Sequence, residues 1–171
     1  FVTGFQNNRD GYANIQKQAQ MFDRAFAQLL SHYQFASFSG LGHSNGGLIY
    51  TAFLQRYFQK YEGVTMEKLL TIASPYNLNR KNPDKQTDML KDFLAQQDRL
   101  PANLQHLSII GLFLGETDGI VHRTSVEAGR LIYKGRIHSH QEVVITGKKA
   151  HHSALVLNDE VISLIKKFLF T

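Results

Sequence analysis

The stretch FASFSGLGHSNGGL, residues 35–48, decides the fold of this chain because it joins two elements of different character. Residues 35–41 are a short, mostly apolar and aromatic run, which predicts a buried strand. The residues after Gly46 predict an apolar helix that begins directly behind a turn. The turn reads G-x-S-x-G, with Ser44 between Gly42 and Gly46. A serine is therefore presented on a tight strand-to-helix turn.

This arrangement is typical of a nucleophile elbow. Side chains at Gly42 and Gly46 would collide with the neighbouring strand and helix, so glycine is expected at both positions. The turn also puts the backbone N–H of Asn45 at a helix N-terminus, where it can donate to a developing oxyanion. An incidental serine in a glycine-rich turn is the alternative. The second glycine, Gly47, and the strand-to-helix context favour Ser44 as a nucleophile.

A serine hydroxyl is a weak nucleophile and needs a general base, which an acidic group orients. In folds with a nucleophile elbow the acid and then the histidine follow the serine along the chain. Asp118 comes after the buried run 107–114, in the sequence GETDG. Glu116 is the nearest alternative, and Asp118-Gly119 could also be a simple turn pair.

The base is expected between the last strand and the last helix, where His151 and His152 are adjacent. Position alone does not choose between them. His43 is a weaker candidate because it is the neighbour of the serine and cannot easily reach back to it. His122 is weaker because it comes too early in the chain.

Apolar runs and helical periodicities alternate along the whole chain. Strands are predicted over 1–5, 35–41, 69–73, 107–114 and 142–146, and helices over 15–33, 46–57, 124–133 and 161–169. The pattern predicts an α/β fold, a mostly parallel sheet covered by helices on both faces, in a single domain over 1–171. The polar stretch at about 75–105, which contains a short amphipathic helix, is interpreted as a lid-like excursion.

Composition argues against several other functions. Lys and Arg outnumber Asp and Glu by 19 to 14, but they are scattered without interleaved aromatic residues, so nucleic-acid binding is not expected. No apolar run approaches the ~20 residues of a membrane helix. The absence of cysteine excludes a thiol nucleophile. Neither H-E-x-x-H nor G-x-G-x-x-G occurs, so we expect no metal and no cofactor.

Beyond these patterns, the chain resembles the DUF915 group of α/β-hydrolases, cell-surface hydrolases of Gram-positive bacteria. The resemblance runs through NNRDGY (7–12), GHSNGGL (42–48), ASPYN (73–77), GETDGIV (115–121) and AHHSAL (150–155). It implies that the acid is the Asp of D-G-I-V, Asp118, and that the base is the histidine directly before S-x-L, His152. It also implies a small-molecule or lipid-like acyl substrate, ester cleavage through an acyl-serine, no cofactor and a location at the cell surface.

Two departures from the family pattern carry expectations. Asn45 replaces the Met of the commoner motif G-H-S-M-G-G. The oxyanion donor is a backbone N–H, so Asn45 is expected to keep this role. The early strand with an H-G turn, which supplies the second oxyanion donor, has no counterpart. Residues 1–5 are interpreted as the strand that follows it, so the N-terminal part of the fold is expected to be missing. A serine peptidase or acyltransferase with the same triad, and a non-catalytic binding protein, remain the alternatives.

Overall fold

The computed structural model describes residues 2–4, 11–78 and 85–171, and of residues 2–4 it describes the backbone only. The strands form a single parallel sheet in the order β1-β2-β3-β4-β5. Their bounds are β1 (Val2–Gly4), β2 (Ser37–Ser44), β3 (Thr65–Ile72), β4 (Gln105–Leu112) and β5 (Ser139–Thr146). Because all strands are parallel, their carboxyl ends meet at one edge of the sheet.

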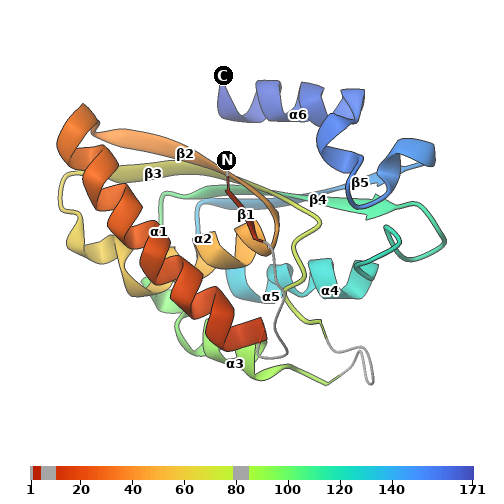
Figure 1. Cartoon of the computed structure of the whole chain (residues 1–171), viewed down its shortest axis with the longest axis horizontal. Helices are drawn as coiled ribbons and strands as arrows, with labels where there is room; N and C mark the ends of the chain where they lie inside the picture. The colour runs from red at the N-terminus through yellow and green to blue at the C-terminus, as the bar shows by residue number, and fades with distance from the viewer. Residues whose placement is uncertain (1, 5–10, 79–84) are drawn as a thin grey trace.

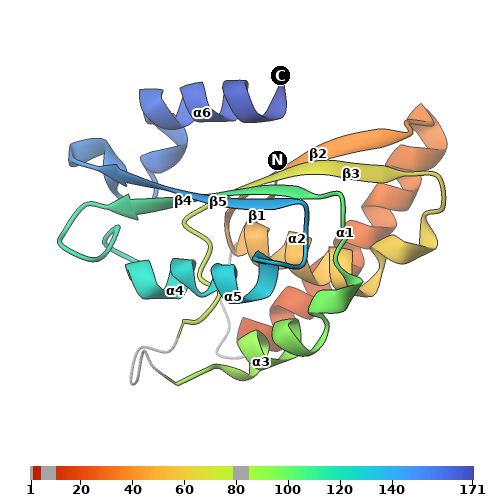
Figure 2. The ribbon, with the colours of Figure 1, turned by 180° about the vertical axis from the view of Figure 1, so that it is seen from behind.

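Helices cover both faces of this sheet. The α-helices are α1 (Gly11–Tyr33), α2 (Asn45–Arg56), α3 (Asp88–Ala95), α4 (Arg123–Glu127), α5 (Gly129–Tyr133) and α6 (Asp159–Leu169). Short 3₁₀ turns occupy Phe58–Lys60, Gln97–Arg99, Lys148–Ala150 and Leu155–Leu157. Helices α1 to α5 lie on one face and α6 lies on the other (Figures 1 and 2). The prediction of a mostly parallel α/β sheet covered on both faces is confirmed.

The side chains of β3 show how the sheet separates two cores. Leu69 belongs to the cluster beneath α2, whereas Leu70 and Ile72 belong to the cluster beneath α6. This alternation follows from the two-residue period of a strand. Leu69 and Leu70 are both fully buried, so β3 lies at the centre of the domain.

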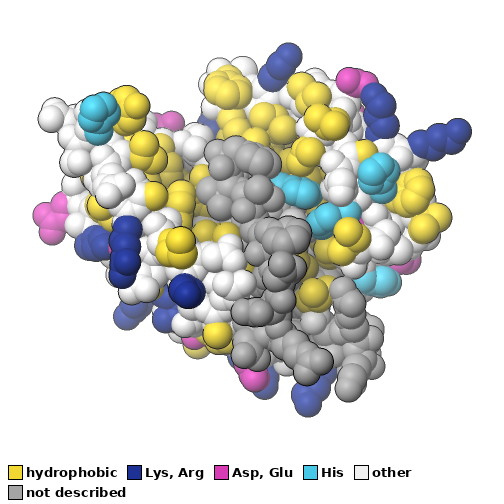
Figure 3. All heavy atoms as spheres, in the orientation of Figure 1, with side chains coloured by type: hydrophobic (Ala, Val, Ile, Leu, Met, Phe, Trp, Pro, Cys, Tyr) yellow, Lys and Arg dark blue, Asp and Glu magenta, His cyan; other side chains and the backbone are white. Residues whose placement is uncertain are grey.

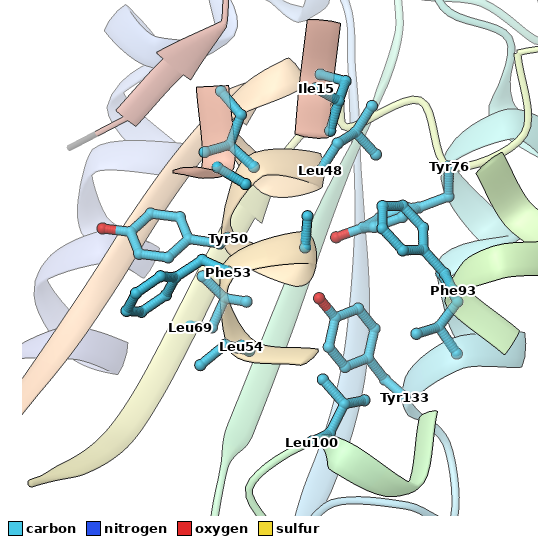
Figure 4. Packing of buried hydrophobic residues seen from close by; sticks show 14 of the residues in the cluster. Ile15, Leu48, Tyr50, Phe53, Leu54, Leu69, Tyr76, Phe93, Leu100 and Tyr133 are labelled. Carbon is cyan, nitrogen blue, oxygen red and sulfur yellow. The ribbon is translucent and has the colours of Figure 1, made fainter. Parts of the chain in front are cut away.

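The larger cluster is built around aromatic rings from α1, from α2 and from the segment that follows α2. The ring centroid of Phe26 lies 5.2 Å from that of Phe53 and 4.9 Å from that of Tyr61. Figure 4 shows Tyr50, Phe53 and Leu54 of α2 packed within this cluster. Rigid packing of α2 matters for the site, because α2 begins directly behind Ser44.

Several predicted boundaries and core positions differ from the structure. Strand β2 does not end at residue 41 but continues to Ser44. The helix predicted over 124–133 is interrupted at Ala128, which separates α4 from α5. Leu29 and Tyr33, predicted on the apolar face of the first helix, are 46% and 68% exposed. In the predicted strand over 1–5, residues 1 and 5 lie outside the described residues.

The described part of the polar excursion packs against the domain. Met89, Leu90 and Phe93 of α3 are buried in the same cluster as α2. The side-chain amide of Gln55 in α2 donates to the backbone oxygen of Phe93 at 2.9 Å. Residues 79–84 lie outside the described residues, so the lid-like role of this stretch stays a prediction.

Candidate active site

Ser44 occupies the junction between β2 and α2 and has an uncommon backbone conformation. Its φ is 55° and its ψ is −125°, although it carries a side chain. Non-glycine residues in this region are strained, by about 1–3 kcal/mol, and persist only where the surrounding structure imposes the geometry. An added Cβ at Gly42 would lie 2.7 Å from the backbone N of Gly47. The close approach of strand and helix therefore requires glycine at position 42, as the sequence predicts for this residue.

A second close approach fixes α2 against β3. A Cβ added to Gly47 would lie 2.2 Å from the Oγ of Ser74 and 3.0 Å from the Cγ2 of Thr71. The hydroxyl of Thr51 donates back to the oxygen of Gly47 at 2.8 Å. The first turn of α2 is thus held from both sides, and Ser44 with it.

Asp118 lies on a tight turn behind β4. Its Oδ1 accepts from the backbone N–H groups of Ile120 and Val121, at 2.9 and 2.7 Å. Its own N–H donates to the oxygen of Val121 at 3.2 Å, and Gly119 has a φ of 93°. The side chain is 2% exposed. Two N–H donors on one oxygen orient the carboxylate and leave Oδ2 free to accept from another group.

The other group is His152, which follows β5. Its Nδ1 lies 2.7 Å from Asp118 Oδ2, and its Nε2 lies 3.0 Å from Ser44 Oγ. Its backbone N–H donates to the backbone oxygen of Asp118 at 2.9 Å. Ser44 and the two residues that the family resemblance selected, Asp118 and His152, are separated by up to 108 positions and meet at the carboxyl edge of the sheet.

The hydrogen bonds around His152 determine its tautomer. A carboxylate oxygen only accepts, so Nδ1 carries the proton that faces Asp118. Nε2 of the neutral ring then has a free lone pair and can accept the hydroxyl proton of Ser44. This is the arrangement that general-base activation of a serine requires.

The other histidines that the sequence offered have different surroundings. His151 is exposed and its ring lies 5.7 Å from that of Phe113. His122 accepts from the N–H of Thr124 at the start of α4. Figure 3 shows histidine and hydrophobic side chains together on the half of the molecule where β4 and β5 end. Of the two adjacent histidines, only His152 reaches both Ser44 and Asp118.

Glu116 does not approach His152. Its side chain is 60% exposed, and its carboxylate lies 3.5 Å from the guanidinium of Arg123.

Asn45 is the first residue of α2, so its N–H has no partner within the helix. Strand β1 pairs directly with β2, with Gly4 opposite Ser44, and residues 5–10 lie outside the described residues.

One contact at this site has no signal in the sequence. The Nε2 of His43 lies 3.0 Å from the backbone oxygen of His152, and the two rings are 4.9 Å apart. Burial, and then the charge of His152, lower the pKa of His43. His43 was considered above as a weak alternative base, and the structure brings it to the backbone of His152 instead.

A chain of polar groups, also without a sequence signal, runs across β3, β4 and β5. Thr71 Oγ1 lies 2.9 Å from His106 Nε2, and His106 Nδ1 lies 3.0 Å from His140 Nδ1. His140 Nε2 lies 3.3 Å from Glu142. Burial lowers the pKa of His106 and of His140.

No group of three or more His, Asp or Glu side chains within the described ranges is arranged to hold a metal ion. No helix in that part of the chain has the length and apolarity to cross a membrane.

The parallel sheet, the strained serine between strand and helix, and the acid and histidine behind later strands define an α/β-hydrolase. The chain belongs to the family described as "Alpha/beta hydrolase of unknown function (DUF915)", whose model matches residues 2–171.

Solved structures agree with this membership. A protein from Lactobacillus plantarum WCFS1, described as a cell-surface hydrolase, is 41% identical, with a TM-score of 0.86 over 98% of this chain and 67% of that one. The lin2722 gene product of Listeria innocua is 28% identical, with a TM-score of 0.84 over 91% and 66%. The chain thus spans about two thirds of each of these relatives.

A lipase-esterase related protein of Clostridium acetobutylicum ATCC 824 is similar in fold alone. It is 15% identical, with a TM-score of 0.56 over 98% of this chain and 81% of that one. Among the curated proteins, none matches the chain.

Proposed function

We propose that this hydrolase cleaves ester-type acyl substrates through a covalent acyl-serine on Ser44. The observation that carries the proposal is the pair of contacts made by His152, 3.0 Å to Ser44 Oγ and 2.7 Å to Asp118 Oδ2. In the first step His152 Nε2 takes the hydroxyl proton while Oγ bonds to the substrate carbonyl carbon. His152 then gives the proton to the leaving alcohol.

The second half of the reaction uses the same groups. His152 takes a proton from water, the resulting oxygen nucleophile attacks the acyl carbon, and the bond to Ser44 Oγ breaks as Oγ regains a proton. Asp118 holds the ring and stabilises the imidazolium that forms in each half. The N–H of Asn45 supplies one donor to the oxyanion, worth about 10²–10³-fold in rate at comparable sites.

Labelling with a fluorophosphonate probe, followed by intact mass, tests the nucleophile. One adduct on the parent and none on Ser44→Ala is the expected result. The adjacent histidines provide a matched pair: His152→Ala should label at least about 10³-fold more slowly, whereas His151→Ala should label like the parent. Absence of an adduct on the complete protein would instead favour a binding protein on this fold.

The acid can be tested with an equally close control. Asp118→Asn keeps the size of the side chain but allows the wrong tautomer of His152, and we expect a loss of about 10³–10⁴-fold in kcat. Glu116→Gln removes an exposed carboxylate two residues away and should have little effect. Equal losses in the two variants would contradict the assignment of the acid.

The same three groups could serve a serine peptidase or an acyltransferase. Matched ester and amide substrates, with and without an added alcohol acceptor, separate these reactions by their products. We favour hydrolysis of small or lipid-like esters because the chain is a member of a hydrolase family. A location at the cell surface is proposed from the description of the Lactobacillus plantarum relative.

A further inference from the structure

We propose that His43 is a positioning residue, which holds the base His152 within reach of Ser44. The inference rests on the serine-hydrolase function proposed above and adds a residue to its site. The observation behind it is the hydrogen bond from His43 Nε2 to the backbone oxygen of His152, at 3.0 Å.

This bond completes a two-sided attachment of the His152 backbone. The N–H of His152 donates to the backbone oxygen of Asp118 at 2.9 Å, and its carbonyl oxygen accepts from His43. The first bond ties the base to the turn behind β4. The second ties it to β2, the strand that ends in the nucleophile itself. The 3.0 Å separation between His152 Nε2 and Ser44 Oγ is thereby set from both sides.

The strand geometry explains why His43 can reach this position. Its backbone pairs with Thr3 of β1 and Ile72 of β3, so it is fixed between two strands. Residues two apart in a strand share a face, so His43 shares the face of Leu41, which packs against the cluster beneath α6. That cluster also contains Ala150 and Leu155, on either side of His152 along the chain.

The hydrogen bond requires a hydrogen on Nε2 of His43. A carbonyl oxygen only accepts, so Nε2 of His43 must carry a hydrogen, as it does in one tautomer of the neutral ring. Burial lowers the pKa of His43, and the charge of His152 lowers it further. A neutral ring 4.9 Å from His152 leaves the base free to take a proton, whereas a cation there would oppose it.

Two variants of similar length separate the donor from the shape of the side chain. His43→Gln keeps an N–H at a similar reach, and His43→Met removes it. On p-nitrophenyl acetate we expect His43→Met to lower kcat about tenfold with KM nearly unchanged. Loss of one neutral hydrogen bond accounts for a factor of about five in kcat, and displacement of the base accounts for the rest. His43→Gln should recover most of the loss. His151→Gln, at the exposed neighbour of the base, should match the parent.

The measurement is made on the complete protein, with kcat divided by the concentration of sites that a fluorophosphonate labels, so that unfolded molecules do not count. His43→Phe, which keeps a ring without a donor, is measured alongside in case His43→Met does not fold. A parent that neither labels nor turns over would overturn the proposed function and this inference together. An active parent with full kcat in the variants lacking a donor, or equal losses in His43→Gln and His43→Met, would overturn the inference about His43 alone.

Discussion

Replacing Ser44 with glycine or with alanine measures the strain that the elbow imposes. Both substitutions remove Oγ, so both lose the hydrogen bond to His152. They differ in the Cβ, which alanine keeps at a φ of 55° and glycine lacks. The difference in stability between the two variants therefore reports the backbone strain without the lost hydrogen bond.

The magnitude follows from the conformation. A non-glycine residue in this region costs about 1–3 kcal/mol. Glycine gives back about 0.5–1 kcal/mol because it gains more freedom in the unfolded chain. We expect the free energy of unfolding of Ser44→Gly to exceed that of Ser44→Ala by about 0–2.5 kcal/mol, with a midpoint near 1 kcal/mol. For a protein of this size the midpoint is a Tm difference of about 2–4 °C.

Urea and thermal denaturation of the two variants provide the assay. Ala27→Gly is the control, since Ala27 is exposed within α1 and has ordinary helical geometry. There the same loss of a Cβ should destabilise by about 0.5–1 kcal/mol, the opposite sign. If Ser44→Gly is no more stable than Ser44→Ala, the argument that packing of β2 against α2 imposes a strained turn is refuted.

Three further outcomes follow from contacts elsewhere in the domain. Burial lowers the pKa values of His106 and His140, so the unfolded chain binds more protons than the folded one as the pH falls below about 6.5. Stability should fall with pH there, by at most about 1.4 kcal/mol per pH unit for each histidine, and His106→Gln should flatten this slope in urea titrations between pH 6.5 and 5. Gly47→Ala should destabilise by about 1–3 kcal/mol, with partial recovery when Ser74→Gly makes room for the new Cβ. Asn158→Ala removes a side chain that accepts from two backbone N–H groups of α6, and should cost about 1 kcal/mol by urea denaturation, whereas Asn158→Ser should cost little.

The layered fold could be predicted from the sequence because its two periodicities are strong, but the ends of elements could not. In the last turns of α1, Leu30, four residues after Phe26, packs against the core. The apolar face therefore continues through Leu30, and Leu29 and Tyr33 are left exposed. The break between α4 and α5 brings Gly129 against the ring of Tyr76, where an added Cβ would lie 2.7 Å from the ring. That contact is non-local and leaves no mark on the local pattern.

The types of residue at the candidate site could be predicted from chain order, whereas the choice between neighbouring candidates could not. The residue pattern alone left His151 and His152 equivalent, and the family resemblance favoured His152. In the structure the backbone N–H of His152 donates to the backbone oxygen of Asp118 and the residue is buried, whereas His151 is exposed. The contact of His43 is harder still to foresee, because it joins a side chain to a backbone atom 109 residues away, and a backbone atom has no residue type to recognise.

Main-chain hydrogen bonds and close backbone packing hold Ser44, Asp118 and His152 in position. These interactions tolerate substitutions of exposed side chains, but any shift of the strands that carry them disturbs them. Gly47→Ala changes no group that contacts Ser44 Oγ, yet a Cβ there meets Ser74 and must push the first turn of α2 away from β3. That turn carries the N–H of Asn45, so the variant should lose activity beyond what its lost stability explains. Ser74→Gly in the same chain should partly restore activity and stability together, because one displacement causes both losses.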